Sequence, residues 1–129
     1  MSTVSEEPVT QAGPTEADED VHSPERAGLQ PAPAQPITTL AAAGDLLRAL
    51  AAPVRIAIVL QLLDLERCVH ELVDALDVSQ PLISQHLRVL KAAGVVYGER
   101  NGREVVYRLV DEHLAHIVVD AVMHAEERR

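Results

Sequence analysis

Large apolar residues recur at the spacing of amphipathic helices from Ile37 onward. A first apolar stripe stops before Pro53, because the residue ahead of a proline is pushed out of the helical region. Pro53 suits the first turn of a second helix, where its missing N–H costs nothing. That helix has apolar residues at i, i+3, i+4 and i+7, the pattern of one buried face. The large apolar residues of these two helical stripes are Leu40, Leu46, Leu47, Leu50, Ile56, Val59, Leu60 and Leu63.

The middle of the chain predicts two helices joined by a tight turn. Residues 69–76 form a short helix with one apolar face. The segment Asp77–Pro81 follows as a turn, with Ser79 or Gln80 as the N-cap of a fourth helix. This helix is expected to stop at Gly94, because glycine is the usual residue just past a helix end.

The last third of the chain predicts a β-hairpin followed by a final helix. The strands Val95–Arg100 and Arg103–Leu109 flank Asn101-Gly102. This dipeptide is preferred in type I′ turns, because both of its positions accept positive φ. The final helix is expected from about Asp111 to the C-terminus. These elements predict a mainly α fold with one small β-hairpin.

Residues 1–36 differ in composition from the rest. They are rich in Pro, Glu, Ala, Ser and Gln and carry almost no large apolar side chain. Such a segment cannot bury enough surface to offset the entropy lost on ordering, so we predict a disordered, acidic, Pro-rich N-terminal tail. Residues 37–129 are expected to form one folded domain. Because the chain has no Phe and no Trp, aliphatic side chains must fill its core.

Composition also bears on the cellular location of the protein. No apolar run approaches the roughly 18 residues that span a bilayer, and the acidic N-terminus is unlike a secretory signal. The single cysteine, Cys68, excludes an intramolecular disulfide framework. We expect a cytoplasmic protein that does not contact a membrane.

The net charge of −9 argues against a nucleic-acid partner until the charge is localised. Residues 1–36 contain seven acidic residues and one arginine, a net charge of −6. Residues 79–108 contain five basic and two acidic residues, a net charge of +3. A basic segment inside an acidic protein is compatible with DNA binding, and it predicts strong sensitivity to salt.

The fourth helix has the two faces that a DNA-reading helix requires. At about 100° per residue, Ile83, Leu87 and Leu90 fall on one side, with His86 at its edge. The opposite side carries groups that hydrogen-bond to bases and phosphates. An ordinary helical hairpin with a solvated polar face would show the same periodicity. The candidate DNA-contacting residues of this helix and the turn before it are Ser79, Gln80, Ser84, Gln85 and Arg88.

The predicted hairpin favours DNA binding over a plain helical hairpin. Its tip carries Arg100 and Arg103 directly after the candidate recognition helix. A basic wing of this kind lies along the phosphate backbone or enters the minor groove. The combination predicts a winged helix–turn–helix that binds double-stranded DNA.

Three segments of the chain resemble one known family. They are LLRALAAPVRIAIVLQLL from Leu46, CVHELVDALDVSQPLISQHLRVLKAAGVV from Cys68, and the wing GREVVYRL from Gly102. In this order and spacing they resemble the ArsR/SmtB family of metal-sensing repressors. The resemblance implies a winged-helix homodimer that binds a palindromic operator and releases it when metal binds.

The final helix carries two pairs of metal-ligating side chains, Asp111 with His113 near its start and His124 with Glu127 near its end. The pairs are about 20 Å apart at 1.5 Å per residue, so one helix cannot bring all four to one ion. Two antiparallel copies can, which gives two symmetric sites across a dimer, each with four N/O ligands that suit tetrahedral Zn²⁺. A solvated helix with scattered His and acidic residues is the alternative. The resemblance favours the metal site, because zinc- and cobalt-sensing members use Asp-x-His and His-x-x-Glu here.

Two further features of this helix concern the metal and the dimer. His116 departs from the four-ligand pattern and is either a spare ligand, a group that supports a ligand, or a sign of a six-coordinate metal such as nickel. The apolar residues of the helix are expected to form the dimer seam, and these are Leu114, Ile117, Val118, Ala121 and Val122.

A second metal site is a separate hypothesis. The resemblance places Cys68 and His70 where cadmium, lead and arsenic sensors carry paired cysteines. One soft ligand suits those ions poorly. Some zinc-sensing members combine this single cysteine with a nearby acid, here Glu71, and with ligands from the N-terminal tail, where His22 is the available donor. An ordinary, partly buried cysteine accounts for Cys68 more simply.

The sequence therefore predicts a metal-responsive transcriptional repressor that binds operator DNA when metal-free and dissociates on binding Zn²⁺. A repressor of the same family that senses Ni²⁺ or Co²⁺ is one alternative. A small zinc metalloenzyme is another, but a catalytic zinc needs an open coordination position, which four protein ligands would close. We do not expect an enzyme.

Overall fold

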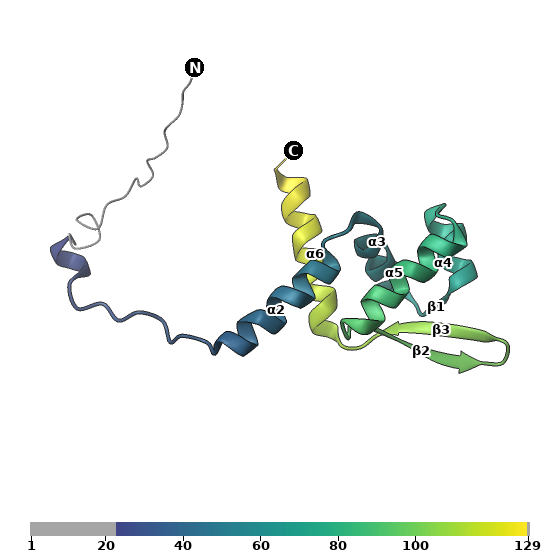
Figure 1. Cartoon of the computed structure of the whole chain (residues 1–129). Coiled ribbons are helices and arrows are strands. Elements are labelled where there is room, and N and C mark those ends of the chain that lie inside the picture. The colour runs from purple at the N-terminus through teal and green to yellow at the C-terminus, as the bar shows by residue number, and fades with distance from the viewer. Residues whose placement is uncertain (1–22, 129) are drawn as a thin grey trace, which may run out of the picture. The chain divides into compact units, whose positions relative to one another are not determined.

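The computed structural model describes residues 23–128 of the chain (Figure 1). The chain divides into two units, Met1–Ala34 and Gln35–Arg129. The described part of the first unit contains one 3-10 turn, η2 (Pro24–Arg26). The prediction of disorder for residues 1–36 falls largely outside the described residues and stays a prediction.

Helices α2 (Ile37–Leu50) and α3 (Pro53–Asp64) open the second unit. Pro53 lies in the first turn of α3, as predicted, and the break before it bends the two helices by 91°. Within the described residues, no single helix has the length and apolarity to cross a membrane. Helices α2 and α3 have that length and apolarity only when they are taken together as this bent pair.

The face of α3 that meets the core only partly coincides with the predicted apolar stripe, of which Val59 is buried and Ile56 and Leu60 pack against the core. Ile58, Val59 and Leu62 are buried, whereas Leu63 is 44% exposed. Most positions of this helix are apolar, so hydrophobic spacing does not select a face. Packing against α5 and α6 selects it instead.

Helices α4 (Val69–Leu76) and α5 (Gln80–Ala92) form the predicted helix–turn–helix. Helix α5 stops where the sequence predicted, since Gly94 follows it with a φ of 77°. The Val95 N–H donates to the Leu90 carbonyl at 2.9 Å. This is a Schellman motif, in which a left-handed residue lets the chain leave the helix.

The sheet has three strands where a two-stranded hairpin was predicted. Strand β2 (Val96–Asn101) pairs antiparallel with β3 (Glu104–Leu109), and β3 also pairs with the short β1 (Arg67–Cys68). Figure 1 shows the β2–β3 hairpin extending away from the helices. The sequence did not reveal β1, because two residues are too few to show strand alternation.

The hairpin turn lies one residue later than predicted. Asn101 pairs with Glu104, so the two loop residues are Gly102 and Arg103. Gly102 has a φ of 69°, and in this loop only the first position has a positive φ. That pattern is typical of a type II′ turn rather than the predicted type I′ turn. Arg103 therefore lies at the very tip of the hairpin.

Helix α6 (Glu112–Glu127) packs against α3 of the same chain. Leu114 and Val118 are only 5% and 2% exposed and belong to the hydrophobic core. The prediction that these two residues form a dimer seam is therefore wrong, because they anchor α6 to its own chain. Ile117 and Ala121 remain exposed, so this part of the predicted seam is left for a partner.

One aliphatic core joins α3, α4, α5, α6 and the start of the hairpin. Among the described residues, no polar or charged side chain is buried in it. Its fully buried side chains are Ile58, Val59, Leu72, Ile83, Leu87, Leu90, Val95 and Val96.

Candidate DNA interface and metal ligands

The turn between α4 and α5 sets the direction of the candidate recognition helix. Asp77 ends α4 in the left-handed conformation, with a φ of 56°, and its N–H donates to the Val73 carbonyl at 2.9 Å. Asp is one of the few non-glycine residues that adopt this conformation readily. Ser79 takes the N-cap position of α5, but its side chain makes no capping hydrogen bond. The Ser79 hydroxyl is thus not committed to the helix.

The two faces of α5 separate as the sequence predicted. Ile83, Leu87 and Leu90 are at most 2% exposed, which confirms the inward face. Gln85 and Arg88 are exposed on the outward face. In residues 23–128 Arg88 forms no ion pair. The outward face therefore offers an amide and a guanidinium, both of which suit DNA.

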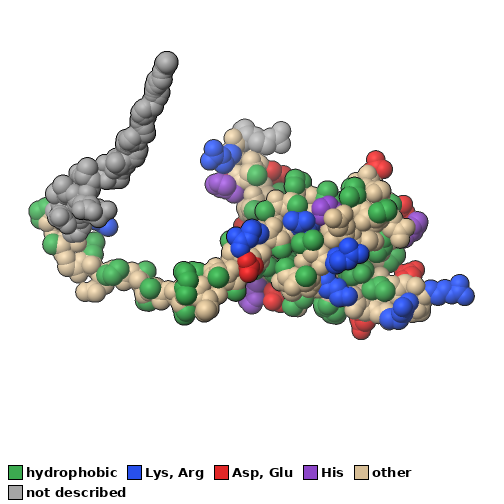
Figure 2. Space-filling view, viewed as in Figure 1, with side chains coloured by type: hydrophobic (Ala, Val, Ile, Leu, Met, Phe, Trp, Pro, Cys, Tyr) green, Lys and Arg blue, Asp and Glu red, His purple; other side chains and the backbone are tan. Residues whose placement is uncertain are grey.

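The wing leaves two arginines exposed at its tip. Arg100 and Arg103 form no ion pair within the described part of the chain. The Arg108 guanidinium is engaged instead, with Nε 3.2 Å from a Glu99 carboxylate oxygen and Nη1 3.5 Å from one of Glu66. Figure 2 shows Lys and Arg side chains gathered over α5 and along the hairpin. The hairpin tip and the outward face of α5 thus both carry exposed basic side chains.

A notch of about 180 Å³ between α5 and β3 is lined in part by two residues that were not predicted from the sequence to contact DNA. Lys91 and Tyr107 line it together with Ser84, Leu87 and Arg88. Lys91 follows Arg88 by three residues and so lies beside it on the helix surface, a spacing already visible in the sequence. Tyr107 joins them only through the register of β3.

The four predicted metal ligands lie at opposite ends of α6. Asp111 is the N-cap residue, and its Oδ1 accepts the Leu114 N–H at 3.3 Å and lies 3.5 Å from His113 Nδ1. His124 and Glu127 are exposed in the last turn. Among the described residues, no three His, Cys, Asp or Glu side chains come together as a metal site. One chain by itself therefore does not assemble the predicted site.

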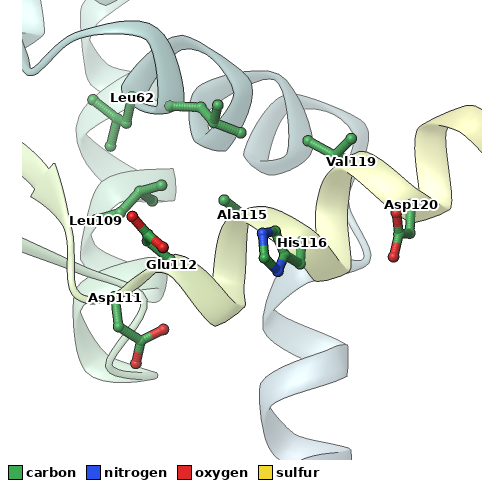
Figure 3. A pocket seen from close by; sticks show the side chains of 9 residues that line it. Leu62, Leu109, Asp111, Glu112, Ala115, His116, Val119 and Asp120 are labelled. Atoms are coloured by element: carbon green, nitrogen blue, oxygen red, sulfur yellow. The ribbon is translucent and has the colours of Figure 1, made fainter.

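His116 lies on a flank of α6 rather than on the face of His113. It borders a cavity of about 470 Å³ between α3, the end of β3 and α6. Figure 3 shows it on the same side of the helix as Glu112 and Asp120. At about 100° per residue, His116 is about 60° from His113 around the helix axis. His116 is thus a neighbour of the His113 position without sharing its direction.

Two residues of the second predicted metal site have structural roles at the start of α4. Cys68 is 8% exposed, and its backbone N–H donates to the Glu71 carboxylate at 2.9 Å. This bond is the carboxylate half of a capping box, which satisfies an N–H that the helix leaves free. His70 is exposed, with Nε2 3.4 Å from an Asp74 carboxylate oxygen. His22 lies outside the described residues.

The capping bond predicts a pH-dependent contribution of Glu71 to stability. The pKa of the Glu71 carboxyl is held below its ordinary value of 4.5, chiefly because the Cys68 N–H donates to the carboxylate. A lowered pKa stabilises the fold above the unfolded-state pKa, and this contribution is lost as the pH falls through the folded-state pKa. Glu71→Gln should therefore lower the thermal midpoint at neutral pH, and the difference should shrink below about pH 4.5.

Calorimetry across this pH range measures the effect. Glu126→Gln, on the exposed last turn of α6, is the matched control and should shift the midpoint little at any pH. A Glu71→Gln difference that is the same at every pH would show that the carboxylate charge does not act through this bond.

Residues 52–97, from the start of α3 into β2, match the model of the family described as "Bacterial regulatory protein, arsR family". The chain is also 65% identical over 126 residues to the HTH-type transcriptional repressor SmtB of Mycobacterium tuberculosis. That alignment covers 88% of this chain and 93% of the relative. The chain belongs to the ArsR/SmtB family.

Comparison of this chain with one further relative and with one solved structure agrees with this assignment. The HTH-type transcriptional regulator NmtR of Mycobacterium tuberculosis is 40% identical over 96 residues, covering 73% of this chain and 80% of the relative. The solution structure of a homodimeric winged helix-turn-helix DNA-binding domain, Mb0332 from Mycobacterium bovis, superposes with a TM-score of 0.66 at 25% identity. It covers 77% of this chain and 92% of the Mb0332 fragment. The likeness confirms the winged helix–turn–helix fold.

Proposed function

We propose that this ArsR/SmtB protein is a homodimeric, cytoplasmic transcriptional repressor that binds a palindromic operator when metal-free and releases it on binding zinc. The observation that carries the proposal is the presence of a complementary half-site at each end of α6. Asp111 and His113 form one half and His124 and Glu127 the other. The name of the similar SmtB protein, a transcriptional repressor, supports the regulatory part.

Exposed apolar side chains support a homodimer. On α2, Ile37, Leu40 and Leu47 are 77%, 50% and 54% exposed, and on α6 Ile117 is 36% exposed. Burying a side chain of this size contributes about 1.5–3 kcal/mol. The similar Mb0332 domain is described as homodimeric. A twofold dimer presents two equivalent recognition helices, so its DNA site is expected to be palindromic.

The donor set on α6 fits zinc in a dimer. All four side chains are exposed, so a second copy of the chain can reach them. Antiparallel α6 helices would bring Asp111 and His113 of one copy beside His124 and Glu127 of the other. Two imidazole nitrogens and two carboxylate oxygens would then be available, a set of four N/O ligands that suits zinc. Zinc held by these residues would cross-link the two copies.

Nickel or cobalt is the alternative metal, and the position of His116 is the observation that favours it. His116 is exposed and follows His113 by three residues, so the two imidazoles are neighbours on the helix surface. A third imidazole suits nickel, which binds nitrogen ligands well. Titration of the same protein with zinc, nickel and cobalt separates the two candidates.

Metal binding at α6 is connected to the recognition helix through packing. Helix α6 packs on α3, and α3 packs on α5. A cross-link between two α6 helices favours one relative orientation of the two copies, and only a difference in metal affinity between orientations shifts their populations. The resulting coupling between metal and DNA is expected to be about 1–3 kcal/mol.

Fluorescence anisotropy with the full-length protein tests the proposal. A duplex selected from a random pool by the metal-free protein serves as the operator. Saturating zinc should weaken its binding by about 5–150-fold. Affinity that is unchanged by zinc, nickel and cobalt would contradict metal sensing, and failure to select any duplex would contradict operator binding.

The wing and the recognition helix should respond differently to substitution. Arg103→Ala is expected to weaken binding to all sequences similarly and to lower the salt slope by about one, because it removes a phosphate contact. Gln85→Ala should cost about 1–3 kcal/mol at particular base pairs and relax the preference there. Binding to a panel of single-base variants at several salt concentrations measures both effects.

Arg108→Ala is the matched control for the wing, because its guanidinium is already engaged by Glu99 and Glu66. It should change the salt slope less than Arg103→Ala does. Equal slopes for the two variants would show that exposure at the tip does not identify the phosphate contact.

A further inference from the structure

The side chain of Arg55 connects three helices. Arg55 lies half-buried in the first turn of α3. Its Nε donates to the Ala49 carbonyl in the last turn of α2 at 2.5 Å. Its Nη1 lies 3.2 Å from Nδ1 of His86, in the middle of α5. One guanidinium thus spans the corner between α2 and α3 and reaches the recognition helix.

The chemistry of the two contacts fixes their direction. The last carbonyls of a helix have no partner within it, and a guanidinium both satisfies the Ala49 carbonyl and complements the negative end of α2. A guanidinium only donates, so Nδ1 of His86 must accept, with the ring proton on Nε2. The planar fork of arginine serves two acceptors in fixed positions, which a lysine ammonium does less well.

The hydrogen bond to His86 gives α5 a directional contact, which its core contacts do not provide. Ile83, Leu87 and Leu90 hold α5 by burial, which is a non-directional interaction, whereas a hydrogen bond has a preferred direction. Among the described residues, the contact between Arg55 and His86 is the one side-chain hydrogen bond that joins α5 to another helix. His86 is next to Gln85, on the edge between the inward and outward faces.

We propose that Arg55 is a positioning residue of the DNA interface. It holds α5 at the rotation that presents the outward face to DNA, and it acts through His86 without touching the DNA. This inference rests on the proposed operator binding. It assigns a DNA-binding role to a residue that lies 31 positions before His86 in the sequence.

Operator binding by full-length variants at several salt concentrations tests the inference. Arg55→Gln and His86→Leu should each weaken binding about tenfold, as expected for loss of a charged hydrogen bond. The double variant should bind no more weakly than the weaker single variant, because both changes remove the same bond. The salt slope should stay that of the original protein, since no phosphate contact is lost. His86→Asn keeps an acceptor near the Nδ1 position and should recover most of the affinity.

The opposite results overturn the inference. Additive losses in the double variant would show that the two residues act separately, and a salt slope lowered by about one would make Arg55 a direct phosphate contact. The imidazole ¹⁵N shifts of the unmodified protein give a second measurement that needs no variant. They should report a neutral His86 ring protonated at Nε2, and a proton at Nδ1 would exclude the bond. If the unmodified protein selects no duplex, the proposed function fails, and the ¹⁵N shifts still test the bond.

Discussion

The His124→Ala variant is expected to lose zinc-induced release while keeping metal-free operator binding close to that of the unmodified protein. His124 is exposed in the last turn of α6, far in the sequence from the recognition helix. Its removal leaves three ligands in each proposed site. Even groups that only hydrogen-bond to metal ligands contribute about 10–100-fold in affinity, so loss of a ligand should cost at least as much. Zinc titration of the operator complex, followed by anisotropy, measures both quantities.

Mixing His124→Ala with His113→Ala tests whether the ligands come from two copies. In such a heterodimer both substitutions fall in one of the two sites and the other site keeps all four ligands. One tight zinc site should therefore be recovered. A site built within a single chain would give no recovery, since each chain would carry its own lesion. His116→Ala is the matched control and should keep the zinc response of a four-ligand site. The absence of tight zinc binding in verified heterodimers would contradict a site shared between two copies.

The Ile117→Glu variant is expected to dissociate the dimer and to weaken operator binding by about 100-fold or more, because two linked half-site contacts become independent. On the helix surface Ile117 lies between His113 and His124, within about 40° of both at 100° per residue. The face that carries the proposed metal ligands would then meet the partner, and a pair of buried like charges there is strongly unfavourable. Sedimentation velocity gives the oligomeric state, and anisotropy gives the affinity.

Met123→Glu is the matched control for Ile117→Glu. Met123 is 52% exposed on the same helix but lies about 120° from Ile117 around its axis. It should leave the protein dimeric and the operator affinity nearly unchanged. A dimeric Ile117→Glu variant, or a monomeric Met123→Glu variant, would place the dimer contact on another face of α6.

The boundaries of several helices could be predicted from the sequence, because local chemistry sets them. Pro53 begins α3 and Gly94 follows the end of α5, as expected from a missing N–H and from a left-handed backbone. The inward face of α5 was also predictable. Ile83, Leu87 and Leu90 recur at i, i+4 and i+7 and so share one side of the helix, whereas the apolar Leu82 and Val89 lie off this side and are exposed.

The candidate site could be predicted only where its residues share one element. The two ligand pairs of α6 and the polar face of α5 follow from helical spacing. Tyr107 could not be assigned to the notch beside Arg88, because its place depends on how β3 pairs with β1 and β2. The turn was displaced by one residue because Gly102-Arg103, with glycine first, also suits a two-residue loop, so the local chemistry of the loop allowed two registers.

The sequence by itself determined several helix boundaries, the order of the helices and of the β2–β3 hairpin, and the inward face of α5, and it supplies the residue types of the proposed ligands. Only the tertiary structure decided which side of α3 is buried, that Leu114 and Val118 belong to the core of their own chain, and that Arg55 reaches His86. The physical reason is the range of the forces. Caps, turns and periodicity act within a few residues, whereas an apolar helix buries whichever side its distant neighbours cover. A hydrogen bond across 31 residues exists only once that packing has brought its two partners together.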